Sequence, residues 1–199
     1  TLGWGVRVQE PTAPYWELMV LAFLAGIGGG AWADPRAEVV VGDAIHYVAE
    51  APTGGFDAII VDSTDPAGPG EVLFTEDFYR HCARALTGRG VVVNQGGVPF
   101  MQGDELRQSS ARRAAFFPDT HAYCIAVPTY VGGFMAIGWG AKDPACRATT
   151  AAEIERRAAG AGVLGTTRYW TPEIHAGAFN LPPYIAECLE AVSGAARKG

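Results

Sequence analysis

The most informative stretch of this chain is residues 56–74, which read Phe56-Asp-Ala-Ile-Ile-Val-Asp62-Ser-Thr-Asp65-Pro66-Ala-Gly-Pro69-Gly-Glu-Val-Leu-Phe74. Its apolar run, residues 58–61, is short enough for a buried parallel strand and stops abruptly at Asp62. A second aspartate, Asp65, follows three residues later in a loop that two prolines stiffen. Because ligands in open α/β sheets bind beyond the carboxyl ends of the strands, both carboxylates are expected to face a substrate.

Strand and helix signals alternate from Arg36 onward with short loops, which is typical of a doubly wound α/β sheet. The last two strand signals differ, because two apolar runs joined by a wide loop predict an antiparallel pair at the edge of the sheet. We expect a helix that Thr75 caps and Gly88 stops, with Phe78, Cys82 and Leu86 along one face. The other elements are expected as strands over 38–41, 58–61, 91–94, 121–127 and 134–140 and helices over 45–51, 104–116, 150–159 and from 171. Thr150, with Glu153 in a capping box, and Thr171, before Pro172, are expected to begin the last two helices.

Composition indicates one globular core and an acidic surface. The chain has 199 residues, 49% of them hydrophobic, and a formal charge of −6. Its two lysines, Lys142 and Lys198, form no basic stripe, so we expect no nucleic-acid partner.

The cysteines and the apolar runs bear on location. Four cysteines are scattered without the close pairs of a zinc site or redox motif, which favours free thiols in a reducing cytoplasm. The longest apolar run, residues 18–27, is about half of the ~20 residues that cross a bilayer. We therefore expect a cytoplasmic protein that does not bind membranes.

Taken alone, each candidate residue also has an ordinary structural interpretation. Asp62 and Asp65 could cap a turn, since Asp-Pro and Ser-Thr are common turn chemistry. Asp43 could be a loop residue, and Tyr130, between two apolar runs, could belong to the core. A metal held by Asp62 and Asp65 is the weakest alternative, because no third oxygen ligand is signalled nearby.

Several motifs in register resemble one family, the spermidine synthases or polyamine aminopropyltransferases. The block 56–74 followed by Thr75-Glu-Asp-Phe-Tyr79 carries the resemblance, and it covers roughly residues 34–189. The other matching motifs, in order, are Gly42-Asp-Ala44, Asn94-Gln95, Pro128-Thr-Tyr-Val-Gly-Gly133, Arg168-Tyr-Trp170 and His175-Ala-Gly-Ala-Phe-Asn-Leu-Pro182.

The resemblance implies a Rossmann-like, methyltransferase-type doubly wound sheet, mostly parallel with an antiparallel edge hairpin. It also implies transfer of an aminopropyl group from decarboxylated S-adenosylmethionine to putrescine, giving spermidine and methylthioadenosine, without a metal. Family members often form homodimers or homotetramers. A primary amine with a pKa near ~10.4 is neutral at pH 7 only about once in 10³, so the enzyme must remove a proton at a cost of roughly 4–5 kcal/mol.

The resemblance further implies roles for particular residues. Asp62 is the base that takes the amine proton, and Asp65 with Ser63 and Thr64 binds the diamine. Gln95 and Tyr130 orient the diamine by hydrogen bonds. At the nucleoside end, Asp43, one strand over in the same sheet, accepts a hydrogen bond from the adenine amino group, and Ala44 and Pro69 line the base.

The first part of the chain departs from the family pattern. We expect residues 1–33 to be an atypical or truncated amino-terminal segment and residues 34–199 to be the catalytic domain. The family's Gly-Gly-Gly-Asp-Gly loop has no recognisable counterpart; the run Gly26-Ile-Gly-Gly-Gly30 lacks the following helix and acidic residue that a cofactor loop needs. Two alternatives therefore stay open: a catalytically inactive remnant or partner subunit, and an S-adenosylmethionine-dependent methyltransferase, against which the Asp62 and Asp65 pair argues.

Overall fold

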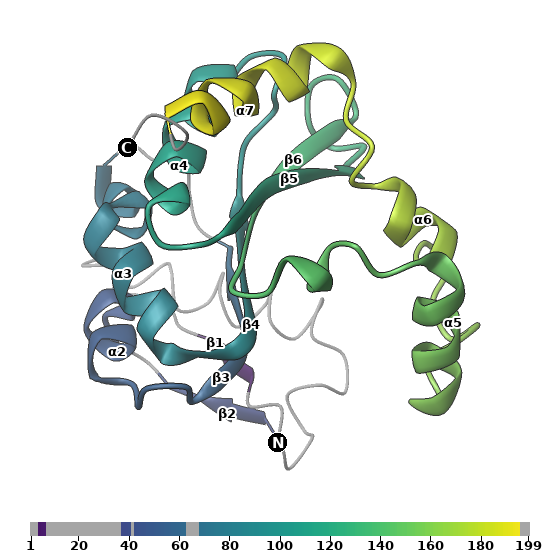
Figure 1. Ribbon diagram of the computed structural model, residues 1–199, viewed down its shortest axis with the longest axis horizontal. Helices are drawn as coiled ribbons and strands as arrows, with labels where there is room; N and C mark the ends of the chain where they lie inside the picture. The colour runs from purple at the N-terminus through teal and green to yellow at the C-terminus, as the bar shows by residue number, and fades with distance from the viewer. Residues whose placement is uncertain (1–3, 7–36, 41, 63–67, 196–199) are drawn as a thin grey trace.

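The computed structural model describes residues 4–6, 37–40, 42–62 and 68–195, and its centre is a four-stranded open sheet (Figure 1). The strand order is β3-β4-β6-β5. The pairing of β3 (Phe56–Val61) with β4 (Leu86–Gln95) is parallel. The strands β5 (Asp119–Ala126) and β6 (Phe134–Ala141) form an antiparallel pair, and β6 is also antiparallel to β4. The predicted α/β fold and its antiparallel edge hairpin are confirmed in a mixed sheet.

Helices lie on both sides of this sheet (Figure 1). One side carries α2 (Ala44–Glu50), α3 (Glu76–Ala85), α4 (Gly103–Ala114) and α7 (Pro183–Ala195). Toward the other side lie the short η3 (Pro144–Cys146), α5 (Ala151–Gly160) and α6 (Pro172–Gly177). None of the helices described is both long and apolar enough to cross a membrane.

Threonine hydroxyls begin three of the helices, as the sequence predicts. Thr75 accepts a hydrogen bond from the backbone N–H of Phe78, Thr150 from that of Glu153, and Thr171 from that of Ile174. Each hydroxyl satisfies a backbone donor that has no partner inside the helix. The helix starts were therefore readable from local chemistry.

The end of α3 differs from the prediction. The helix stops at Ala85, and Leu86 begins β4 instead of completing the apolar helix face. Leu86 is still buried, because it pairs with Phe56 across the sheet before the register shifts to Ala58 opposite Val91. The same apolar spacing suits a helix face or a strand in the core, and strand pairing decides between them.

The predicted place of the strand before Asp43 is wrong. The strand β2 (Ala37–Val39) pairs in parallel with β1 (Trp4–Val6) in a separate two-stranded sheet and is not a strand of the four-stranded sheet. An apolar run predicts a strand, but it does not predict which strand will pair with it. Strands pair through backbone hydrogen bonds, and the backbone groups that form them are the same whatever the side chains.

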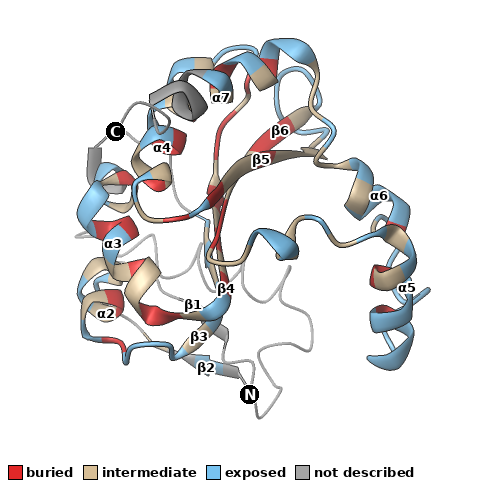
Figure 2. Cartoon of the chain, in the orientation of Figure 1, coloured by how far each residue is buried: buried red, intermediate tan, exposed pale blue. Residues whose placement is uncertain are grey.

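Two apolar clusters hold the helices on the sheet, and Figure 2 shows buried residues on α2, α3 and α4 and on the strands of the sheet. The first joins α2 and α3 to β3 and β4 through residues such as Phe78, Cys82 and Val92. The second joins α4 and α7 to the hairpin through Leu106, Ala136 and Ile185. All four cysteines are free thiols, as predicted.

An aromatic group covers the opposite side of the hairpin. The ring of Phe179 lies 5.2 Å from Tyr123 and 5.3 Å from Trp139, and 6.2 Å from both His121 and His175. Burial lowers the pKa of both histidines below the usual value. The neutral imidazole is therefore the form that this layer accommodates.

We expect acidification to weaken this layer. The pKa of His121 and of His175 is lower in the folded protein than in the unfolded chain, so the unfolded chain binds protons first as the pH falls. The stability that the neutral histidines contribute is therefore fully present above the unfolded pKa of ~6.5 and is lost as the pH falls through their folded pKa values. Urea unfolding measured at a series of pH values from about 7.5 to 5 should show this decline.

The double variant His121→Asn and His175→Asn should flatten this decline in stability. The control His46→Asn, on the exposed surface of α2, should leave the decline unchanged. A double variant with the full pH dependence would contradict this assignment.

A buried carboxylate anchors the start of the hairpin. Asp119 accepts hydrogen bonds from Arg147 Nη2 at 2.7 Å, from Arg147 Nε at 3.0 Å and from Trp139 Nε1 at 3.0 Å. We expect Asp119→Asn to lower the unfolding free energy by about 2–3 kcal/mol, less than for a fully buried pair because the Arg147 side chain is 34% exposed and can turn to water. Chemical denaturation measures the loss, and Asp77→Asn, which breaks an exposed ion pair with Arg80, is the control with little expected change.

Candidate active site

Two of the predicted site residues leave neighbouring strands at the same edge. Asp62 directly follows β3, and Gln95 is the last residue of β4. The register pairs Val61 with Asn94, so the next residue on each strand is Asp62 and Gln95. Asp62 is exposed and Gln95 is half-buried. A carboxylate and an amide therefore lie beside one another where α/β proteins bind ligands.

Tyr130 belongs to the same edge. Because β6 is antiparallel to both of its neighbours, β5 runs in the direction of β4, and the loop 127–133 leaves where β4 ends. The loop is closed by backbone bonds from Val127 N–H to Gly133 O at 2.9 Å and from Gly133 N–H to Tyr130 O at 3.0 Å. Tyr130 is 48% exposed, so its alternative assignment to the core is wrong.

Asp43 has a structural role that the sequence did not single out. Its Oδ1 accepts from the backbone N–H of Ile45 at 2.8 Å and of His46 at 3.4 Å, which caps α2. Ala44 is the first residue of that helix and is half-buried. Since both bonds go to the same oxygen, a cap of this kind leaves Oδ2 able to accept from another donor.

The remaining candidates lie wholly or partly outside what the structure describes. Ser63, Thr64 and Asp65 lie outside the described residues, so the pairing of Asp62 with Asp65 stays a prediction. The backbone of Pro69 belongs to the short helix η2 (Gly68–Phe74), but its side chain is outside what the structure describes.

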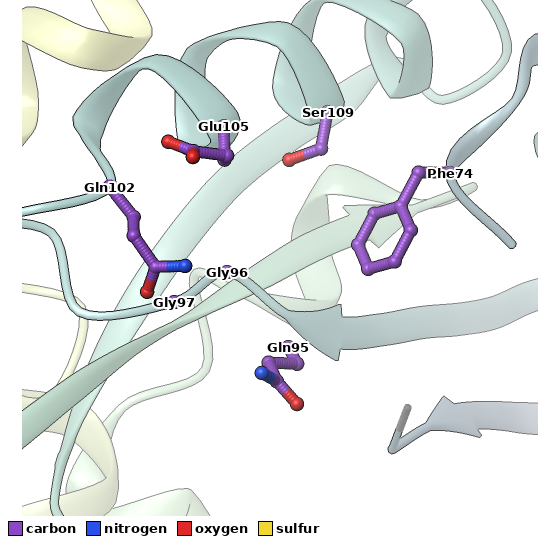
Figure 3. A pocket seen from close by; sticks show the side chains of 7 residues that line it. All are labelled: Phe74, Gln95, Gly96, Gly97, Gln102, Glu105 and Ser109. Atoms are coloured by element: carbon purple, nitrogen blue, oxygen red, sulfur yellow. The ribbon is translucent and has the colours of Figure 1, made fainter. Parts of the chain in front are cut away.

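A small hollow opens at the end of β4 (Figure 3). Its volume of about 10 Å³ is room for about one water molecule. A second hollow of about 100 Å³ shares three of its wall residues. Together they are lined by Glu71, Phe74, Gln95, Gly96, Gly97, Gln102, Glu105, Gln108, Ser109 and Arg112.

The turn after Gln95 is ordered by a single amide. Gln102 Oε1 accepts from the backbone N–H of Val98 at 2.8 Å, and Gly97 has a φ of 79°. A Cβ at Gly97 would come within 2.6 Å of that oxygen. Glycine is therefore required here both by the backbone conformation and by the close approach of Gln102.

Sequence reasoning missed the contribution of α4 to this edge. Glu105 and Ser109 come from α4, and Glu71 and Phe74 from η2. The local signal was the Gln95-Gly-Gly97 turn leading to acidic Asp104 and Glu105. Carboxylates at such an edge favour a cationic ligand.

The residues described contain no group of three or more His, Cys, Asp or Glu side chains arranged to hold a metal ion. Arg112, the cation in the second hollow, donates a hydrogen bond to the backbone oxygen of Phe74 at 3.0 Å. The edge thus offers hydrogen-bond acceptors, with one arginine held against the backbone.

Comparison with known proteins matches the same region. Residues 20–150 match the family model of the spermine/spermidine synthase domain. The polyamine aminopropyltransferase of Ruegeria sp. (strain TM1040) is 48% identical over 163 residues, 82% of this chain and 56% of that protein. That of Pseudomonas syringae pv. tomato is 42% identical over 175 residues, 88% of this chain and 60% of that protein.

Solved structures agree with the sequence relatives. A spermidine synthase in complex with the transition-state analogue AdoDATO superposes with a TM-score of 0.74 at 29% identity, over 93% of this chain and 61% of that one. The spermidine synthase from Thermotoga maritima gives 0.72 at 27% identity, over 93% and 60%. The chain spans about three fifths of the length of these relatives. The protein belongs to the spermine/spermidine synthase family.

Proposed function

We propose that this chain carries the catalytic domain of a polyamine aminopropyltransferase, which moves an aminopropyl group from decarboxylated S-adenosylmethionine to putrescine. The observation that carries the proposal is Asp62 at the carboxyl end of β3, beside Gln95 on the next strand, in a member of this family. The products are spermidine and methylthioadenosine. The proposed domain covers residues 34–199, and the family model matches residues 20–150.

Asp62 is the base in this proposal. Its carboxylate accepts a proton from one ammonium of putrescine, and the freed nitrogen lone pair attacks the carbon beside the sulfonium. The new N–C bond forms as the C–S bond breaks, and the bonding electrons stay on sulfur, which becomes neutral in methylthioadenosine. In-line attack depends on positioning, which Gln95, Tyr130 and the 63–65 segment supply.

The nucleoside lies at the other end of the proposed site. Asp43 accepts from the adenine amino group through the oxygen not used to cap α2, and Ala44 and Pro69 line the base.

In the proposed assembly two or four copies of the chain associate in the cytoplasm. The four free thiols fit the reducing conditions of that compartment. Light scattering on the purified protein measures the number of copies.

The test is incubation of purified protein with putrescine and decarboxylated S-adenosylmethionine, with methylthioadenosine as the readout. Product that depends on both substrates supports the proposal. Measurable putrescine binding without product supports an inactive remnant. Transfer from S-adenosylmethionine itself, releasing S-adenosylhomocysteine, would support a methyltransferase instead.

We expect Gln95→Ala to weaken amine binding more than chemistry. Loss of one hydrogen bond to a cationic amine is worth about 1.5 kcal/mol, which raises the KM for putrescine roughly tenfold. The KM for the nucleoside substrate should not change, because Gln95 lies at the amine end. Steady-state kinetics with each substrate varied separately measures both, and an equal rise in the two KM values would contradict the assignment.

A further inference from the structure

A buried arginine lies between α4 and the end of β4. Arg113 of α4 has no exposed surface, and its Nη1 donates to Asn94 Oδ1 at 2.5 Å and to the Tyr79 hydroxyl at 3.3 Å. Its Nη2 donates to Ser110 Oγ at 2.9 Å. The guanidinium also lies 5.6 Å from the centre of the Tyr79 ring. The cluster thus joins α3, α4 and β4.

In the part of the chain that the structure describes, every hydrogen-bond acceptor of this guanidinium is neutral. Within the described residues no ion pair involves Arg113, and its Nε has no hydrogen-bond partner. Burial lowers the pKa of Arg113 and raises that of Tyr79, which shows how unfavourable this environment is for charge. Because a buried charge without a counter-ion costs several kcal/mol, an apolar side chain of similar size would serve stability as well or better.

The sheet provides room for the guanidinium. The register aligns Asn94 on β4 with Gly138 on β6 and Gly138 with Ala122 on β5. A Cβ at Gly138 would come within 2.5 Å of Arg113 Nη1. The row of strands therefore presents one amide and two small residues to Arg113.

The cluster connects directly to the proposed amine site. Asn94 Nδ2 donates to the backbone oxygen of Gln95 at 2.7 Å. Neighbouring strand residues point to opposite faces, and Figure 3 shows Gln95 on the side of β4 away from Ser109 of α4. A second restraint comes from β6, where Gly96 N–H donates to Ala136 O at 2.9 Å. The end of β4 is thus held by the Asn94 side chain on the face toward α4 and by the neighbouring strand β6.

We propose that Arg113 is a positioning residue for the amine site: it orients the Asn94 amide, which fixes the Gln95 carbonyl and with it the direction in which the Gln95 side chain leaves β4. This inference rests on the proposed function, because it assigns Arg113 a role in amine recognition. Arg113 touches no substrate in this arrangement. Its effect passes through Asn94 to Gln95.

The first experiment compares Arg113→Met with Arg107→Met, an arginine on the exposed face of the same helix that pairs with Asp104. Arg113→Met should keep or raise the thermal midpoint, speed hydrogen exchange at the Gln95 and Gly96 amides about tenfold, and raise the KM for putrescine about tenfold. The KM for decarboxylated S-adenosylmethionine and all values for Arg107→Met should stay within about twofold of wild type.

A second variant separates positioning from folding. Asn94→Asp keeps the acceptor for Arg113 and supplies a counter-charge, but it replaces the amide that donates to the Gln95 carbonyl by an oxygen. It should fold stably and still raise the KM for putrescine. Adding Arg113→Met to Gln95→Ala should cause no further rise, because both act through the same side chain.

The outcomes distinguish the inference from the function beneath it. Wild-type protein that makes no methylthioadenosine overturns the proposed function. Unchanged hydrogen exchange at the Gln95 and Gly96 amides in Arg113→Met shows that Arg113 does not hold the end of β4, whether or not the protein is active. Active wild type with an unchanged putrescine KM in Arg113→Met, or with additive effects in the double variant, overturns the positioning role.

Discussion

Asp62→Asn is expected to lower kcat for aminopropyl transfer by about 10²–10⁴-fold, the range for loss of a general base. Asparagine keeps the size of the side chain and can still accept a hydrogen bond, but it cannot take a proton from an ammonium. The amine then reacts only through its rare neutral form, so the loss should shrink as the assay pH rises toward the amine pKa near ~10.4.

The matched control for this variant is Asp57→Asn. Asp57 lies near the start of β3, away from the carboxyl end, and accepts a hydrogen bond from Thr87 at 3.2 Å. Its substitution should leave kcat and both KM values unchanged. Methylthioadenosine release followed by chromatography measures both proteins, and an Asp62→Asn variant as active as the control would rule Asp62 out as the base.

Gly138→Ala should have the largest effect on stability. The new methyl group would lie within 2.5 Å of the Arg113 guanidinium, which is enclosed and has no solvent-facing alternative. Displacing it breaks the hydrogen bonds that compensate a buried charge, so we expect a loss of at least ~3 kcal/mol and a fall in Tm of roughly 6–12 °C.

Rescue and control variants make this result specific. Arg113→Met added to Gly138→Ala should recover most of the loss, because the flexible apolar chain can move aside and carries no charge. Gly160→Ala, at the end of α5 where an added Cβ meets nothing within 4 Å, should not destabilise the protein. A Gly138→Ala protein with wild-type Tm would show that the packing around Arg113 is looser than described.

Local chemistry accounts for what the sequence predicted well. The threonine caps of α3, α5 and α6 are side-chain to backbone bonds within three residues, and the edge hairpin follows from two apolar runs separated by a glycine-containing loop. The placement of Asp62 at the end of a strand is likewise local, since the carboxylate ends the apolar run.

Some features of the candidate site needed more than local signals. The role of Asp43 as the cap of α2 was within reach of the sequence, because a cap of this kind spans two or three residues. The resemblance of Gly42-Asp-Ala44 to a family motif assigned Asp43 to the adenine amino group instead. The lining contributed by Glu105 and Ser109 depends on where α4 packs on the sheet, which the local signal of the Gln95-Gly-Gly97 turn does not specify.

The sequence by itself determined the class of fold and the position of Asp62 directly after β3, because both follow from the pattern of neighbours along the chain. Only the tertiary structure decided that Leu86 opens a strand, that β2 pairs with β1, and that Arg113 lies buried between α4 and the end of β4. Burial and strand pairing arise from contacts between segments far apart in sequence, and an arginine in a helix reads as a surface residue until the strands beneath it are in place.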